Sequence, residues 1–145
     1  MAIYRLYPEK DTFISSKITG SNAGRDEILE IASYHQKVIE GHAHRQMVQY
    51  KLSEIQDTLN NLATPTFSSS LHFSLADANE LDESYSIEAF PLAQSWENGK
   101  GKFADVPIDT SGCSWRYRTK NQGSQWSLST PPAGATGSYA GNATG

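Results

Sequence analysis

Apolar and polar positions alternate with a period of two in the middle of the chain. Leu71, Phe73 and Leu75 are separated by single polar residues. Successive side chains of a strand point to opposite faces, so this pattern places the three apolar side chains on one face. The sequence therefore predicts half-buried strands over 70–75 and, by the same alternation, over 86–90.

The period changes from strand-like to helical close to residue 52. A strand predicted over 45–52 places Val48, Tyr50 and Leu52 on its apolar face. Over 53–62 the apolar residues recur every three or four positions, which predicts a short helix. The Ser-x-x-Gln pattern that starts at Ser53 predicts a capping box at the beginning of this helix.

The remaining elements are predicted to be short strands joined by turns. The mixed aromatic and β-branched composition of four further segments is typical of strands: 3–7, 12–15, 27–31 and 114–118. Turn signals occur over 20–24 and at Asn98-Gly99. No alternation of strands with long helices is present, so a parallel sheet is not expected. The predicted fold is all-β, an antiparallel β-sandwich of jelly-roll type with one short helix.

The chain divides into three predicted parts. Residues 1–9 form an N-terminal strand or arm, and residues 10–128 form the β-sandwich domain. Residues 129–145 are rich in Gly, Thr, Pro and Ala and contain almost no bulky apolar side chain. Such a segment cannot bury enough surface to order itself, so it is predicted to be a linker or tail that continues into further sequence.

Composition and charge exclude several classes of protein. Hydrophobic residues make up 37% of the 145 residues and charged residues 19%, so neutral polar residues are abundant. The net charge is −4, which disfavours binding to nucleic acid because phosphate backbones attract clustered Lys and Arg. Long apolar runs and a secretory signal pattern are missing, so neither membrane insertion nor secretion is expected. Cys113 is the single cysteine, which excludes an internal disulfide and a cysteine-based zinc site.

Candidate catalytic and metal-binding groups are weak. His35, His42 and His44 form the one metal-like set, and they are more simply interpreted as polar residues between strands. The acidic residues of 77–83 are more typical of a solvated connection than of a calcium site or a glycosidase pair. We therefore predict no catalytic residues, no metal site, no cofactor and no enzymatic activity.

Aromatic residues suggest one binding site. Trp96 and Trp115 are predicted core anchors of a domain that has few aliphatic residues. Trp126 follows a polar, glycine-containing stretch and is the candidate for stacking against a sugar ring. A carbohydrate-binding module that recognises a host surface glycan is therefore the alternative function.

The order of several short segments resembles β-sandwich domains of the DNRLRE or disaggregatase-related type. The resemblance begins at Lys10-Asp11-Thr12-Phe13-Ile14-Ser15 and continues through 45–53, 70–75 and 85–92 to Trp96-Glu97-Asn98-Gly99. It covers about residues 10–118. Each segment is short, and their order carries the resemblance, which implies a sandwich fold.

A second resemblance concerns virion structural proteins of tailed phages, especially cyanophage-like phages of marine bacteria. The opening residues 1–14, the motif 95–101 and the motif 112–118 are similar to that group. The resemblance implies a non-enzymatic virion component, in a capsid, neck, tail decoration or fibre, that is made in the bacterial cytoplasm and assembled into the virion.

The partners expected for such a component are copies of itself and other virion proteins. Extended termini and sheet edges offer backbone groups for strand addition, and tyrosine is enriched at interfaces. The residues predicted to make assembly contacts are Ile3, Tyr4, Leu6, Tyr7 and Tyr139.

Overall fold

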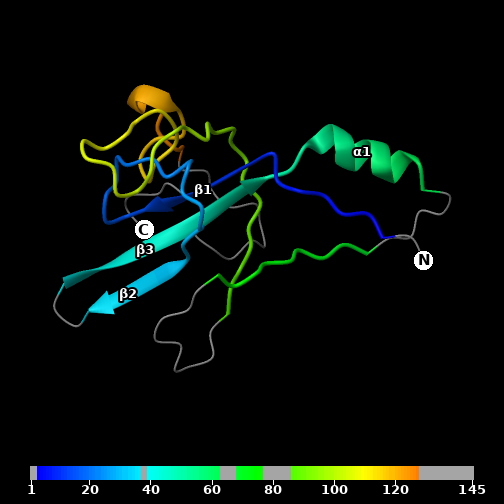
Figure 1. The fold of residues 1–145 in the computed structure, drawn as a ribbon, viewed down its shortest axis with the longest axis horizontal. Coiled ribbons are helices and arrows are strands. Elements are labelled where there is room, and N and C mark those ends of the chain that lie inside the picture. The colour runs from blue at the N-terminus through cyan, green and yellow to red at the C-terminus, as the bar shows by residue number, and fades with distance from the viewer. Residues whose placement is uncertain (1–2, 37–38, 63–67, 77–85, 128–145) are drawn as a thin grey trace.

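The structure, a computed structural model, describes residues 3–36, 39–62, 68–76 and 86–127, and within 33–41 it describes the backbone alone. The elements are β1 (Lys10–Ser15), β2 (Ala32–Gln36), β3 (Ile39–Gln49), α1 (Leu52–Asn60) and a 3₁₀ turn (Lys120–Gln122). The sheet and the loops around it form a compact part, from which α1 and several extended segments project to one side (Figure 1).

The described sheet has three antiparallel strands in the order β1-β3-β2. β3 is the central strand, and it pairs with β1 so that Thr12 lies opposite Met47 and Ile14 lies opposite Arg45. Residues directly opposite each other in an antiparallel pair point to the same face. The register therefore places Thr12, Ile14, Arg45 and Met47 together on one face of the sheet.

That face covers the apolar core. Ile14 and Met47 are buried against side chains from the C-terminal loops: Trp96, Cys113, Trp115 and Trp126. Two cations from the sheet pack on the tryptophan rings. The Arg45 guanidinium lies 4.8 Å from the ring centre of Trp115. The Lys10 Nζ atom lies 4.5 Å from the ring centre of Trp96. Through such cation–π contacts, charged residues can cover the edge of a small aromatic core.

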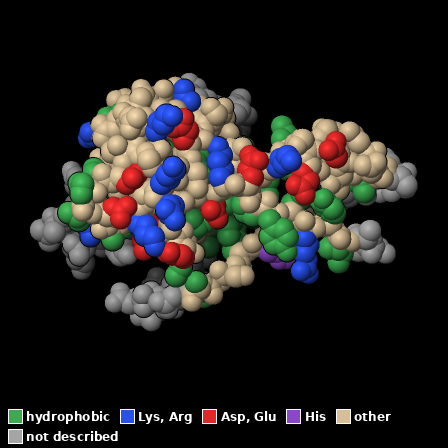
Figure 2. Space-filling view, turned by 45° about the horizontal axis from the view of Figure 1, so that its top comes forward, with side chains coloured by type: hydrophobic (Ala, Val, Ile, Leu, Met, Phe, Trp, Pro, Cys, Tyr) green, Lys and Arg blue, Asp and Glu red, His purple; other side chains and the backbone are tan. Residues whose placement is uncertain are grey.

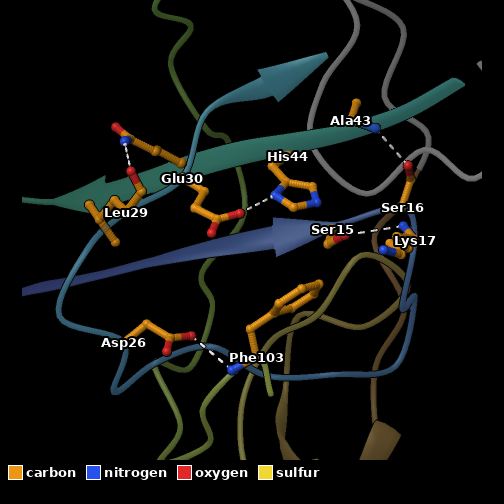
Figure 3. Close-up of polar contacts among 10 residues, drawn as sticks. Ser15, Ser16, Lys17, Asp26, Leu29, Glu30, Ala43, His44 and Phe103 are labelled. Atoms are coloured by element: carbon orange, nitrogen blue, oxygen red, sulfur yellow. Dashed lines mark hydrogen bonds and ion pairs between the residues drawn. The ribbon is translucent and has the colours of Figure 1, made fainter. Parts of the chain in front are cut away.

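The other face of the sheet is closed by aromatic rings and one ion pair. The rings of Phe13 and His44 stack with centroids 5.6 Å apart, and Phe103 contacts both rings. The Nδ1 atom of His44 lies 2.7 Å from a carboxylate oxygen of Glu30 (Figure 3). Loop residues thus cover the second face, which keeps the three strands in place without a second described sheet.

The central strand and the helix confirm two sequence predictions, with corrections. β3 contains most of the strand predicted over 45–52, but its buried apolar residue is Met47, so the prediction that Val48 and Tyr50 form the core face is wrong. The predicted helix is present as α1. Its N-cap is Lys51, which makes no side-chain cap, so the capping box at Ser53 is also wrong.

Most of the other predicted strands are absent from the described residues. Residues 27–31 form a loop, and the strand begins only at Ala32. Residues 70–75 and 86–90 are extended but belong to no ladder. In the segment 114–118 a single bridge pairs Tyr117 with Gln125. The described residues therefore form one antiparallel sheet and one short helix, and they do not form the two sheets of a β-sandwich.

Candidate functional site

The N-terminal segment 3–8 is an extended arm with exposed apolar side chains. Ile3, Tyr4 and Tyr7 are 80%, 59% and 76% exposed, and Leu6 is half-buried. No backbone–backbone hydrogen bond joins residues 3–8 to another part of the described chain, and the first such bond is from the Glu9 amide to the Gln49 carbonyl. The arm therefore presents apolar side chains together with backbone groups that have no backbone partner in the described part of the chain.

The arm is held to α1 by one side-chain contact. The Tyr4 hydroxyl donates a hydrogen bond of 3.0 Å to the Glu54 carboxylate. Both groups are exposed, so this contact stabilises the arm only weakly. The arm is thus positioned beside the helix but remains available to a partner.

Residues 68–76 form a second exposed extended segment. Leu71, Phe73 and Leu75 are 46%, 53% and 74% exposed. No backbone–backbone hydrogen bond links 68–76 or 86–91 to any other described residue. This segment therefore combines exposed apolar side chains with a backbone that has no backbone partner among the described residues. Such a combination promotes edge-to-edge association.

The exposed segments lie partly on the same side of the molecule. In Figure 1 the arm and α1 project to the right of the sheet, and residues 68–76 start on that side and run back below the sheet. On the face seen in Figure 2, Lys, Arg, Asp and Glu are interspersed over the compact part, and hydrophobic side chains gather where that part meets the projecting segments. Hydrophobic side chains are therefore exposed beside the compact part, and the projecting segments carry charged side chains as well (Figure 2).

The predicted glycan platform is not formed by Trp126. Its side chain is 8% exposed, lies in the core cluster, and donates an indole N–H hydrogen bond of 2.9 Å to the Ser114 carbonyl. A ring packed on the sheet cannot stack on a sugar, so this assignment is corrected. A polar hollow of about 320 Å³ lies nearby, lined by Ala93, Gln94, Ser95, Arg118 and Ser127. It has no aromatic wall, so glycan binding stays a prediction from the sequence.

The described residues offer little for catalysis or metal binding. No group of three or more His, Cys, Asp or Glu within them is placed to hold a metal ion. His44 is buried against Glu30, while the side chain of His35 lies outside the described part. Burial in the core raises the pKa of Cys113 to about 12, so its thiol is not a reactive nucleophile near neutral pH. No helix in the described ranges is long and apolar enough to cross a membrane.

The predicted assembly residues fall into two groups. Ile3, Tyr4, Leu6 and Tyr7 lie together on the arm, whereas Tyr139 lies outside the described residues. Residues 68–76 were not predicted as a site, because their alternating pattern is typical of a half-buried strand. The signal that was available is the absence of Lys, Arg, Asp and Glu from this segment.

Comparison with known proteins gives no relative: no family model, no curated protein and no solved structure matches the chain.

Proposed function

We propose that this protein is a non-enzymatic structural component of a phage virion that acts through assembly contacts with copies of itself and with neighbouring virion proteins. The observation that carries the proposal is the exposed arm 3–8, in which three large apolar side chains and an unpaired backbone face solvent. A free-standing monomer gains nothing from such an arm, whereas a partner that pairs with it buries both features.

The composition of the body supports the same role. The net charge of −4 and the mixed charges over the compact part favour solubility before assembly. Tyrosine contributes large contact area at a low entropic cost, and the arm carries two tyrosines. The arm is then an assembly element attached to a soluble body.

The β-sandwich belongs to this proposal as well. The three-stranded sheet supplies one layer, and residues 70–75 and 86–90 carry the alternation of further strands. These segments would complete a second sheet when a partner pairs with them in the assembled particle.

The test is the location of the protein in infected cells. Particles are separated from free protein on a density gradient, and peptides of this chain are quantified by mass spectrometry in both fractions. We expect the wild-type chain in the particle fraction. A variant with Ile3, Tyr4 and Tyr7 changed to Ser should move to the free fraction. A matched variant with Val106 and Ile108 changed to Ser should stay with the particles, because these exposed apolar residues lie outside the arm. Wild-type protein found only as free protein would contradict the proposal.

A further inference from the structure

Residues 68–76 have the symmetry of a self-pairing strand. Read outward from Phe73, the sequence has Leu71 and Leu75 at two positions on either side, and small or polar residues between them. Two copies aligned antiparallel about Phe73 would therefore place each Leu71 opposite the partner's Leu75. Such a two-fold contact is isologous, because the same patch serves on both copies.

Nothing in the charge of this segment opposes the pairing. Residues 68–76 contain no Lys, Arg, Asp or Glu, so no like charges face each other across the two-fold axis. Protein edges normally carry charges that prevent association, and this segment has none. The apolar side chains are already about half exposed or more, so pairing does not first require them to leave a core.

We infer that residues 68–76 of two copies of this chain pair as antiparallel strands about Phe73, and that this pairing makes a homodimer. The inference rests on the proposed function, since it names one of the self-contacts. Pairing about Phe73 gives the exposed leucines and phenylalanines of the two copies a shared apolar face.

The first measurement is the dimer affinity of the full 145-residue chain by sedimentation velocity. Phe73→Glu brings two negative charges together at the axis, so the dissociation constant should rise by about 100-fold or more. His72→Glu adds the same charge on the opposite face of the strand, away from the axis. This variant should change the dissociation constant by less than about threefold. Equal effects of the two variants would overturn the inference.

The second measurement tests the register by disulfide formation. Opposed Cβ atoms in an antiparallel pair are about 4.5–5.5 Å apart, close to the distance that a disulfide spans. Phe73→Cys should therefore cross-link two copies under mild oxidation. Leu71→Cys alone should not, because two Leu71 positions lie about 13 Å apart in this register. A mixture of Leu71→Cys with Leu75→Cys should cross-link. Wild-type protein is the control, because Cys113 is buried.

The results separate this inference from the proposed function. Cross-linking by Leu71→Cys alone, or a wild-type chain that stays monomeric, would overturn the strand pairing. If the protein were nevertheless found in particles, the virion role would stand with different contacts. If a paired dimer formed but the protein stayed outside particles, the pairing would stand and the virion role would fall.

Discussion

The side chain of Asn22 is bonded to the backbone of Asn98, although the two residues are 76 positions apart. Its Nδ2 atom donates to the Asn98 carbonyl at 2.7 Å and to the Cys113 carbonyl at 2.8 Å. Its Oδ1 atom accepts from the Gly24 amide at 3.2 Å and from the Gly101 amide at 2.9 Å. One fully buried amide thus joins three loops that cover the sheet.

Replacing Asn22 should destabilise the compact part strongly. Asn22→Ala leaves several buried backbone groups without a partner, and each such group costs about 1–3 kcal/mol. We expect a loss of about 3 kcal/mol in the free energy of unfolding, measured by urea denaturation. Asn60→Ala is the matched control, because Asn60 is exposed on α1 and, among the described residues, its side chain bonds only to the nearby Gln56 side chain. A loss below about 1 kcal/mol for Asn22→Ala would contradict this role.

The approach of the loops also requires glycine at position 112. A Cβ atom there would lie 2.5 Å from the Asn98 carbonyl oxygen and from the backbone of Gly99, which has a φ of +83°. Gly112→Ala should therefore cost about 1–3 kcal/mol in thermal or urea unfolding, because backbone atoms must move. Gly20→Ala is the comparison, since its nearest neighbour would be a side-chain atom at 3.5 Å. Equal stability of the two variants would argue against this close packing.

Cys113 reports on opening of the core. Its folded pKa of about 12 lies above the value of 9.0 for an unperturbed thiol. The unfolded chain therefore loses this proton first, and the thiol's contribution to stability is full below pH 9 and decreases between about pH 9 and 12. At pH 8 we expect labelling of Cys113 by a thiol reagent to be slow in the native protein and fast in urea. Fast native labelling would show that the core opens readily.

Trp126 should behave as a core residue. Trp126→Ala removes a buried ring and its hydrogen bond to Ser114, so we expect a loss of about 3–5 kcal/mol in the free energy of unfolding. Trp126→Phe keeps most of the apolar volume and should lose less, since it gives up mainly the hydrogen bond. A Trp126→Ala variant as stable as the wild type would contradict the core role and make Trp126 a candidate surface residue again.

Helices and strands with a local sequence pattern can be predicted from the sequence. Burial and side-chain contacts that depend on distant segments cannot. The helix over 53–62 and the strand at Phe13 and Ile14 follow from short-range patterns, and both are present. The burial of Met47 instead of Val48 depends on which face the tryptophans cover, which no local pattern encodes. The role of Asn22 depends on loops more than seventy residues away.

The same contrast between local pattern and long-range contact applies to the candidate site. Composition predicted a strand or extended arm at the N-terminus. In the structure residues 3–7 form no strand, and Ile3, Tyr4 and Tyr7 are exposed. The segment 68–76 has a strand pattern but no described partner within its own chain. Alternation alone cannot distinguish a strand paired inside the chain from one that pairs with a second copy.

The central claim is that the exposed segments of this chain are contacts between copies, and the molar mass in solution tests it most directly. Sedimentation equilibrium over a wide range of protein concentration should give a mass that rises from 15.9 kDa toward a multiple of that value. Phe73→Glu should hold the mass near the monomer value over the same range. A wild-type chain that remains at 15.9 kDa at every concentration would contradict the account.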